Sequence, residues 1–266
     1  MAITSFDPGL VAAAKQYVSL AKTATRTAAG SAWTSVIDLA GNPGAGVLAG
    51  TSTTVGVVPV AGQAGFPIIN AFGGGATGYL AQMDFGSSVA GRLKLFDLLW
   101  KGGAYAFNAA VSGQAPTSFS SRVPAGTDFT DTQLWYEQVT AGTGIPSVNV
   151  TYTNQSGTAG KTTGVTAMPA AMIVGRCQQL PLAAGDSGLQ GVTGVAATVA
   201  TVGTFNLLVV RPIWSGRVRI NNDGGVHGPL ETGMPIIYPT SALMMLVNPD
   251  ASATGVTELE FVIANG

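Results

Sequence analysis

The chain has 266 residues and a formal net charge of −1, and only 9% of its residues are charged, 12 Lys and Arg and 13 Asp and Glu. An ordinary soluble domain carries roughly 25% charged residues, so a free monomer of this composition has few charges with which to solvate its surface. A chain with no excess of positive charge is also poorly suited to a phosphate backbone, which argues against nucleic-acid binding. The composition therefore predicts a non-enzymatic building block whose surface is partly covered by partners, although abundant neutral polar residues could also solvate it.

The chain has one cysteine, Cys177, and one histidine, His227. A single cysteine excludes an intrachain disulfide, and the two residues are too few for a thiolate metal site, so we expect no metal and no cofactor. The start of the chain lacks the basic and apolar regions of a secretory signal, which predicts synthesis in the cytoplasm. The charge-free run 187–210 is interrupted by glycines and predicts a strand, a turn and a second strand instead of a membrane span.

A first helix is predicted from Pro8 to Lys22, with Asp7 as its cap and proline in its first turn. Apolar residues recur on one face at three- and four-residue steps: Leu10, Ala14, Tyr17 and Ala21. Residues 23–31 are small and polar and indicate a linker. We interpret residues 1–30 as a helix and linker that could serve as an assembly arm.

Residues 31–266 are predicted to form one β-rich domain that contains an unusual segment at 38–84. No charged residue lies between Asp38 and Asp84, and glycine and proline interrupt the segment repeatedly. It can be interpreted as strands with flexible turns or as a segment laid along a partner. The candidate partner-contact residues are Leu10, Tyr17, Phe66, Phe72 and Tyr79.

A second helix is predicted from Ser87 to Lys101, because a lysine and two glycines at its end are typical of a helix C-terminus. Its apolar positions are Val89, Leu93, Phe96, Leu99 and Trp100.

Later in the chain the apolar period changes to two, which is typical of strands. Residues 148–153 alternate and predict a half-buried strand, followed by a turn at 154–160, while residues 205–210 are apolar on both faces and predict a central strand. Residues 217–220 and 258–261 alternate charge with apolar side chains, so Arg217 and Arg219 could face Glu258 and Glu260 across an antiparallel pair. The predicted fold is mainly β, an antiparallel sandwich or jelly-roll-like barrel with an N-terminal helix and one further helix near 87–101.

Three short motifs invite an enzyme or nucleotide interpretation. Residues 185–188, Gly-Asp-Ser-Gly, resemble a serine-protease nucleophile loop, but His227 follows Ser187 where that family places its histidine before the serine. Residues 160–162 resemble the end of a P-loop, but the first glycine of that motif is missing. Residues 73–78 have the glycine spacing of a dinucleotide-binding fingerprint, and Asp97 lies at about the sequence distance expected for a ribose contact. No helix pattern follows these glycines, however. We expect turns or loops at all three, and a Ser187–His227 hydrolase is the weakest functional hypothesis.

Two oxygen-rich clusters are also better explained as turns. Asp128 with Asp131, and residues 221–225, lack the number and spacing of ligands that a calcium loop requires. No catalytic, cofactor-binding or metal residue is therefore assigned from the sequence.

The whole chain resembles a group of tailed-bacteriophage structural proteins. The supporting strings are residues 1–8 (MAITSFDP), 68–79 (IINAFGGGATGY), 104–108 (AYAFN), 150–155 (VTYTNQ), 174–177 (VGRC), 180–182 (LPL), 212–217 (PIWSGR) and 263–266 (IANG). The resemblance implies a virion component made in the host cytoplasm. Within that class we favour a capsid decoration or cement protein, because such proteins are often β-sandwich trimers at capsid three-fold positions.

The partners implied are then the major capsid protein or other virion proteins and further copies of the chain, with a homotrimer favoured and with no nucleic acid or membrane. A tail tube or head–tail connector protein is the alternative, and a host-binding spike is a further one.

Overall fold

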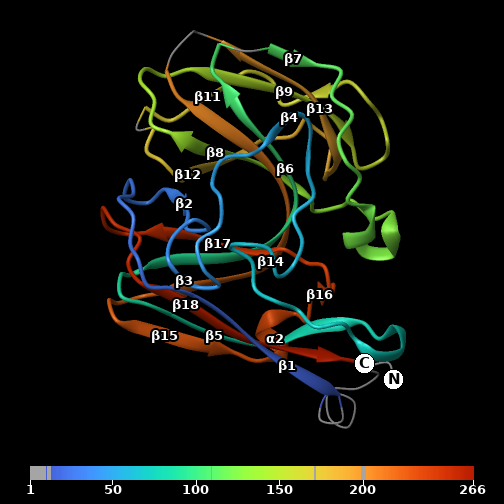
Figure 1. Ribbon diagram of the computed structural model, residues 1–266, viewed down its shortest axis with the longest axis vertical. Helices are drawn as coiled ribbons and strands as arrows, with labels where there is room; N and C mark the ends of the chain where they lie inside the picture. Colours follow the sequence, from blue (N-terminus) through green and yellow to red (C-terminus); the bar gives the residue numbers. More distant parts are fainter. Residues whose placement is uncertain (1–9, 11–12, 109, 171, 199–201) are drawn as a thin grey trace.

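The computed structural model describes residues 10, 13–108, 110–170, 172–198 and 202–266. The chain is mainly β and its sheets are antiparallel, as the sequence predicts. Three layers lie along the longest axis of the molecule, with a closed barrel between two sheets (Figure 1). The structure thus contains a closed barrel within a mainly β, antiparallel fold.

The barrel is a ring of six strands in the order β14-β8-β12-β2-β17-β6, closed because β14 also pairs with β6. Its members are β2 (Trp33–Ser35), β6 (Gly91–Ala106), β8 (Gln133–Thr140), β12 (Arg176–Leu180), β14 (Thr204–Val218) and β17 (Leu243–Pro249). A further strand, β4 (Ser52–Val57), pairs with β6 outside the ring. The inward side chains form one apolar core that includes Phe96, Trp135, Leu208 and Met244.

One sheet covers the lower side of the barrel in Figure 1, and its strands run in the order β15-β5-β18-β1-β3, with β16 also paired to β5. Its members are β1 (Ala14–Lys22), β3 (Gly41–Asn42), β5 (Gly78–Ser87), β15 (Asp223–His227), β16 (Ile236–Ile237) and β18 (Thr257–Asn265). Alternate residues of this sheet, such as Met83 and Phe261, pack against Leu95 and Met245 on the outside of the barrel. The other face of the sheet carries no further layer of the described chain.

The second sheet covers the opposite side of the barrel and has the order β10-β9-β13-β7, with β11 also paired to β9. Its members are β7 (Ala110–Ser112), β9 (Ser147–Asn154), β10 (Lys161–Thr162), β11 (Thr166–Ala167) and β13 (Leu189–Thr198). Its Val150 and Val192 share a core with Tyr136 and Phe205 on the barrel. The predicted strand at 148–153 and its following turn are confirmed, as is the central position of 205–210 in β14, between β6 and β8.

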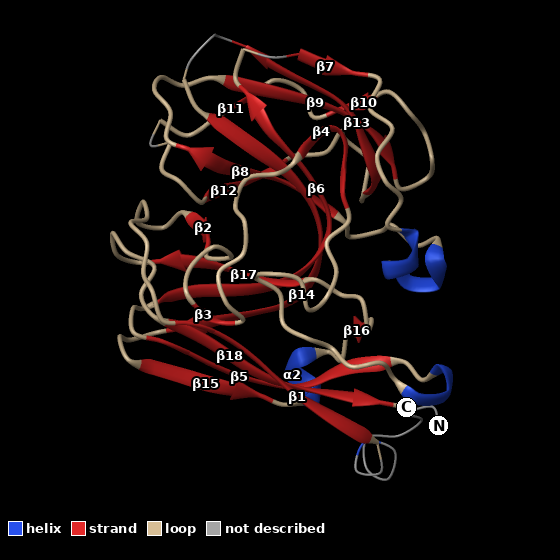
Figure 2. Cartoon of the chain, in the orientation of Figure 1, coloured by secondary structure: helices blue, strands red, loops and turns tan. Residues whose placement is uncertain are grey.

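The helical elements are short (Figure 2). Those that lie wholly within the described residues are α2 (Pro229–Thr232) and the 3₁₀ turns η1 (Gly73–Gly75), η2 (Ser120–Arg122) and η3 (Pro124–Gly126).

The predicted first helix is wrong over Ala14–Lys22, which is strand β1, although Leu10 is helical. Val18, Leu20 and Lys22 are buried and the residues between them are more exposed, so the period is two. Apolar residues spaced by four satisfy both periods, and pairing with β18 and β3 decided between them. Residues 8–9 and 11–12 lie outside the described residues.

The predicted helix at 87–101 is also wrong, since these residues end β5 and form most of β6. Arg92 and Lys94 alternate with the buried Leu93 and Leu95, and from Phe96 onward both faces of the strand are buried. One face there looks into the barrel and the other toward a covering sheet. A strand buried on both sides loses its alternation, and a chance helical spacing of apolar residues then misleads.

The predicted pairing of Arg217 and Arg219 with Glu258 and Glu260 is wrong as well. Strand β18 lies between β5 and β1, whereas β14 belongs to the barrel. Arg217 lies opposite Arg92 of β6 instead. Alternation of charge identified both segments as strands but carried no information about their partners.

The charge-free segment 38–84 packs largely against its own chain. Leu48 and Phe66 are buried in the barrel core. The Leu48 carbonyl accepts a hydrogen bond from Asn206 Nδ2 at 2.7 Å, and the Gly50 amide donates to Asn206 Oδ1 at 2.8 Å. We call residues 46–50 and 65–66 the plug, because they close one side of the barrel core. The lack of charge in this region therefore follows in part from internal burial.

Candidate functional site

The outer face of the sheet that contains β5 and β18 carries a group of exposed acidic side chains. Asp84 lies on β5 and Glu258 and Glu260 lie on β18, and all three are exposed. We call these three residues the acidic face. Their positions follow from strand alternation, since the intervening residues point into the core below the sheet. Asp223 of β15 is also exposed, but it pairs with Ser87 and so belongs to the other face of the sheet, like His227 opposite Met83.

The strand register brings two of these acids together. Glu260 lies directly opposite Asp84, and Glu258 lies opposite Gly86. Like charges at directly opposite positions destabilise a sheet. In the described part of the chain no ion pair or side-chain hydrogen bond involves these three carboxylates, so their charges are left to solvent or to a partner.

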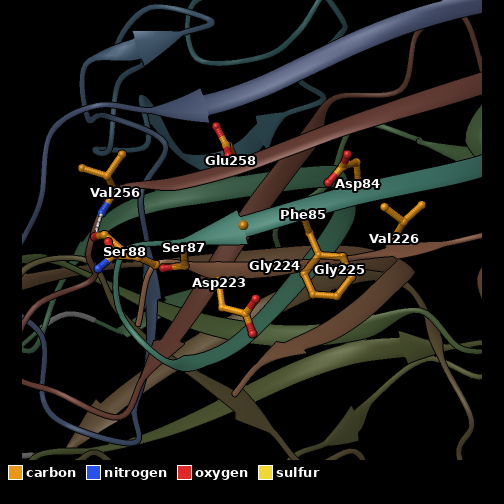
Figure 3. A pocket seen from close by; sticks show the side chains of 12 residues that line it. Asp84, Phe85, Ser87, Ser88, Asp223, Gly224, Gly225, Val226, Val256 and Glu258 are labelled. Carbon is orange, nitrogen blue, oxygen red and sulfur yellow. Dashed lines mark hydrogen bonds between the residues drawn. The ribbon is translucent and has the colours of Figure 1, made fainter. Parts of the chain in front are cut away.

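Two shallow hollows lie on this face. One, of about 490 Å³, is lined by Asp84, Asp223 and Glu258 together with the glycines of β5 and β15. In Figure 3 Asp84 and Glu258 project to one side of the strands, whereas Asp223 projects to the other side, with Phe85. The other hollow, of about 610 Å³, is lined by Tyr17, Gln82, Asp84 and Glu260, and Lys15 of β1 is the cation that borders it. Asp84 borders both hollows, so they form one continuous surface.

The floor of the first hollow is kept low by glycine. A Cβ added at Gly224 would lie 2.2 Å from the Phe85 carbonyl oxygen, and one added at Gly86 would lie 3.0 Å from Glu258 Oε1. Larger residues at these positions would displace the neighbouring strand or the Glu258 side chain. The face is therefore open to close approach by another surface.

His227 supports this sheet from its inner side. Trp214 Nε1 donates a hydrogen bond to His227 Nδ1 at 2.9 Å, and the Phe85 ring lies 5.0 Å from the imidazole. The only histidine of the chain thus links the sheet to the barrel strand β14.

The proposed nucleophile Ser187 lies on the opposite side of the molecule. Its amide donates to Gln155 Oε1 at 3.2 Å, next to β9 and β13, whereas His227 belongs to β15 (Figure 1). The barrel separates the two sheets, so the Ser187–His227 hydrolase hypothesis is wrong.

The Gly-Asp-Ser-Gly turn has a structural explanation. Asp186 accepts hydrogen bonds from Tyr152 Oη and from Asn154 Nδ2, both at 2.7 Å, and these bonds hold the pKa of Asp186 below its usual value. Burial, followed by the bond to Asp186, raises the pKa of Tyr152 to about 12. The aspartate therefore anchors the loop to β9.

The nucleotide motifs also form structural elements. Strand β5 begins at Gly78 after the η1 turn, so no helix follows the glycines at 73–78, and Asp97 is buried beside Arg122. Lys161 and Thr162 form β10, the returning strand of a hairpin with β9.

The predicted oxygen-rich turns hold no metal-ligand cluster. Asp128 Oδ1 accepts the Thr130 amide at 3.0 Å, which is a turn interaction. No group of three or more metal-ligating His, Cys, Asp or Glu side chains occurs in the described residues. The helices in that part of the chain are all too short or too polar for a transmembrane span.

The predicted partner-contact residues are dispersed. Tyr17 is 81% exposed and borders the second hollow, while Leu10 and Tyr79 are half-buried. Phe72 packs against the core below the acidic face, and Phe66 is buried in the plug, so Phe66 is not available as a contact. Sequence reasoning missed the acidic face, because Asp84 and Glu260 are 176 positions apart and only the register brings them together.

Comparisons with known proteins add little. No family model matches the chain, and no curated protein matches it. Among solved structures the chain is similar, at 8% identity and a TM-score of 0.15, to the D431N mutant VP2 protein of infectious bursal disease virus in derived T=1 particles. The match covers 95% of this chain and 77% of that one, but a TM-score this low carries no argument about fold or function.

Proposed function

We propose that the chain is a structural subunit of a tailed-bacteriophage particle, and within it a head decoration or cement protein that stabilises the capsid through contacts with other subunits. The surface charge of the folded chain is the observation that supports this proposal. Six charged side chains are buried among the described residues: Lys22, Asp97, Lys101, Arg122, Glu137 and Arg211.

At most 19 of the 25 charged residues therefore remain for the surface. The surface area of the chain is 10639 Å², which leaves about 560 Å² for each charge, as large as the largest apolar patch of a typical monomer. Folding thus makes the charge deficit of the sequence more severe, and such a surface is better suited to burial against other subunits than to free solution.

Exposed apolar side chains give this proposal a place on the molecule. Tyr17 is 81% exposed and Ile68 is 71% exposed, and both line a hollow of about 490 Å³ between β1 and the loops at 42–45 and 62–68. No charged residue lines this hollow. We assign this hollow as the contact with the capsid, and we favour a trimer of the chain at its capsid position.

The experiment compares capsids assembled with and without the chain. Purified chain added to capsids that lack it should bind to saturation, raise their temperature of disruption and appear on the head surface by cryo-electron microscopy. The Tyr17→Ser/Ile68→Ser variant should bind at least tenfold more weakly. A matched control is Ile145→Ser/Val165→Ser, which changes two similarly exposed residues beside β9 and β11.

Density in the tail tube or the neck instead of the head would favour the tail or connector alternative. Loss of host attachment with unchanged capsid stability would favour a host-binding spike. No binding to any part of the particle would contradict the structural proposal as a whole.

A further inference from the structure

We propose that the acidic face binds an arginine-rich surface on a second copy of this chain. This inference rests on the proposed function, since a particle subunit occurs in many adjacent copies. In this contact Asp84 and Glu260 of one copy pair with Arg92 and Arg217 of the next.

The arginine-rich surface lies where strands β6 and β14 pair. Arg92 is directly opposite Arg217 in the register, and Arg219 follows immediately after β14. All three side chains are exposed. We call these three residues the arginine corner.

The arginine corner is poorly neutralised within its own chain. Arg217 forms an ion pair with Asp250 at 3.9 Å, and both side chains are about half exposed. Such exposed ion pairs contribute little to stability. Among the described residues Arg92 and Arg219 have no acidic partner. The chain therefore places two cations opposite each other on one surface and two anions opposite each other on another.

These two surfaces do not neutralise each other inside the monomer. The arginine corner belongs to the barrel, and the acidic face is the outer side of the sheet below it. Several other cations of this charge-poor chain are buried, including Lys22, Lys101, Arg122 and Arg211. In a chain with a net charge of −1, the concentration of unpaired charges of opposite sign on two surfaces favours contact between copies.

The shape of the acidic face fits this role. Gly86 and Gly224 leave the floor of the first hollow without side chains, so long arginine side chains can reach the carboxylates of Asp84 and Glu258. Arginine is suited to such a contact because its planar guanidinium can bond to a carboxylate through two N–H groups. The contact joins different surfaces of the two copies, which are brought into register by complementary charge.

The test uses charge reversal on the full chain. Two variants are compared with the unmodified chain by sedimentation velocity at low and high salt. The face variant is Asp84→Lys/Glu260→Lys, and the corner variant is Arg92→Glu/Arg217→Glu. Each variant alone should weaken self-association at least tenfold, and an equimolar mixture of the two should restore it. Ser156→Lys/Thr158→Lys, in the exposed β9–β10 turn, is the control and should associate like the unmodified chain.

Unfolding curves of each variant show whether it folds. A chain that stays monomeric at high concentration and low salt, or a mixture that associates no better than the separate variants, would overturn the inference. Capsid binding of the same proteins is measured separately with an Ile68→Ser variant as reference, because Ile68 lines the proposed capsid contact but neither hollow of the acidic face, whereas Tyr17 lines both surfaces. If the unmodified chain binds capsids but does not self-associate, this inference is contradicted and the proposed function stands. If the chain self-associates but does not bind capsids, this inference stands and the proposed function is contradicted.

Discussion

Arg122 donates a hydrogen bond to Asp97 Oδ1 at 3.1 Å, and both side chains are almost completely buried. Arg122 comes from the η2 turn and also donates to the carbonyls of Leu98 and Leu99, while Asp97 lies on β6. Burial lowers the pKa of Arg122, and the neighbouring Asp97 raises it again. This cluster fastens an irregular segment to the longest strand of the barrel.

Replacing Arg122 by alanine should lower the free energy of unfolding by about 3–5 kcal/mol, because it leaves the buried Asp97 with a weaker partner, Arg211 at 3.5 Å. Urea denaturation measures the change. Arg219→Ala removes an exposed arginine and is the control, with an expected change within about 0.5 kcal/mol. Equal effects of the two substitutions would show that the buried ion pair does not stabilise the fold.

The plug can be tested with two neighbouring residues. Leu48 is 7% exposed and packs in the barrel core, while Val47 is 64% exposed. Leu48→Ala should cost about 2–4 kcal/mol of unfolding free energy through lost burial and the cavity left behind, whereas Val47→Ala should cost under about 0.5 kcal/mol. If both changes left stability unaltered, segment 38–84 would not be part of the core.

Tyr152 predicts a loss of stability at high pH. Its pKa is about 12 in the folded chain, against roughly 10 for an unfolded tyrosine. Because the folded pKa is the higher one, the stabilisation is complete below pH 10 and is lost as the pH rises from about 10 to about 12. Unfolding free energies measured across this range should fall less steeply for Tyr152→Phe, and identical slopes would contradict the assignment.

Cys177 should resist thiol reagents in the folded chain. The thiol is buried on β12, and burial, together with the nearby Glu137, raises its pKa well above the usual value. Since the thiolate is the reactive form, labelling should be slow until the chain is unfolded in guanidinium. A Ser156→Cys variant places a second thiol in an exposed turn and should gain one rapidly labelled group per chain. Rapid labelling of the unmodified folded chain would show that β12 opens readily.

The sequence predicted most reliably the strands whose two faces differ. Residues 148–153 alternate because β9 has the core on one side and a more exposed face on the other. The stretch 205–210 does not alternate, but its apolar character on both faces correctly predicts a central strand. The turn at 154–160 was also predictable, since Asn154 Oδ1 accepts hydrogen bonds from the nearby amides of Ser156 and Thr158. The turn at 185–188 follows from its glycines, but its anchoring through Asp186 to Asn154 depends on a strand far away in the sequence.

Residues 14–22 and 91–101 were not predictable in the same way. In β1 the spacing of apolar residues fits a helix as well as a strand, and in β6 the second half is buried on both faces. The choice was made by partners far along the chain, since Val18 pairs with Phe261 and Trp100 with Val209. No local pattern specifies such partners, because hydrogen bonds between strands join backbone atoms that are the same in every residue.

The acidic face and the arginine corner show the same division. The sequence by itself determined that the chain has few charges and that Glu258 and Glu260 alternate with core residues. Only the tertiary structure decided that Asp84 lies opposite Glu260, that Arg92 lies opposite Arg217, and that six other charged residues are buried. Composition and alternation are properties of the local chain, whereas register and burial depend on which distant strands pair to close a barrel and cover it.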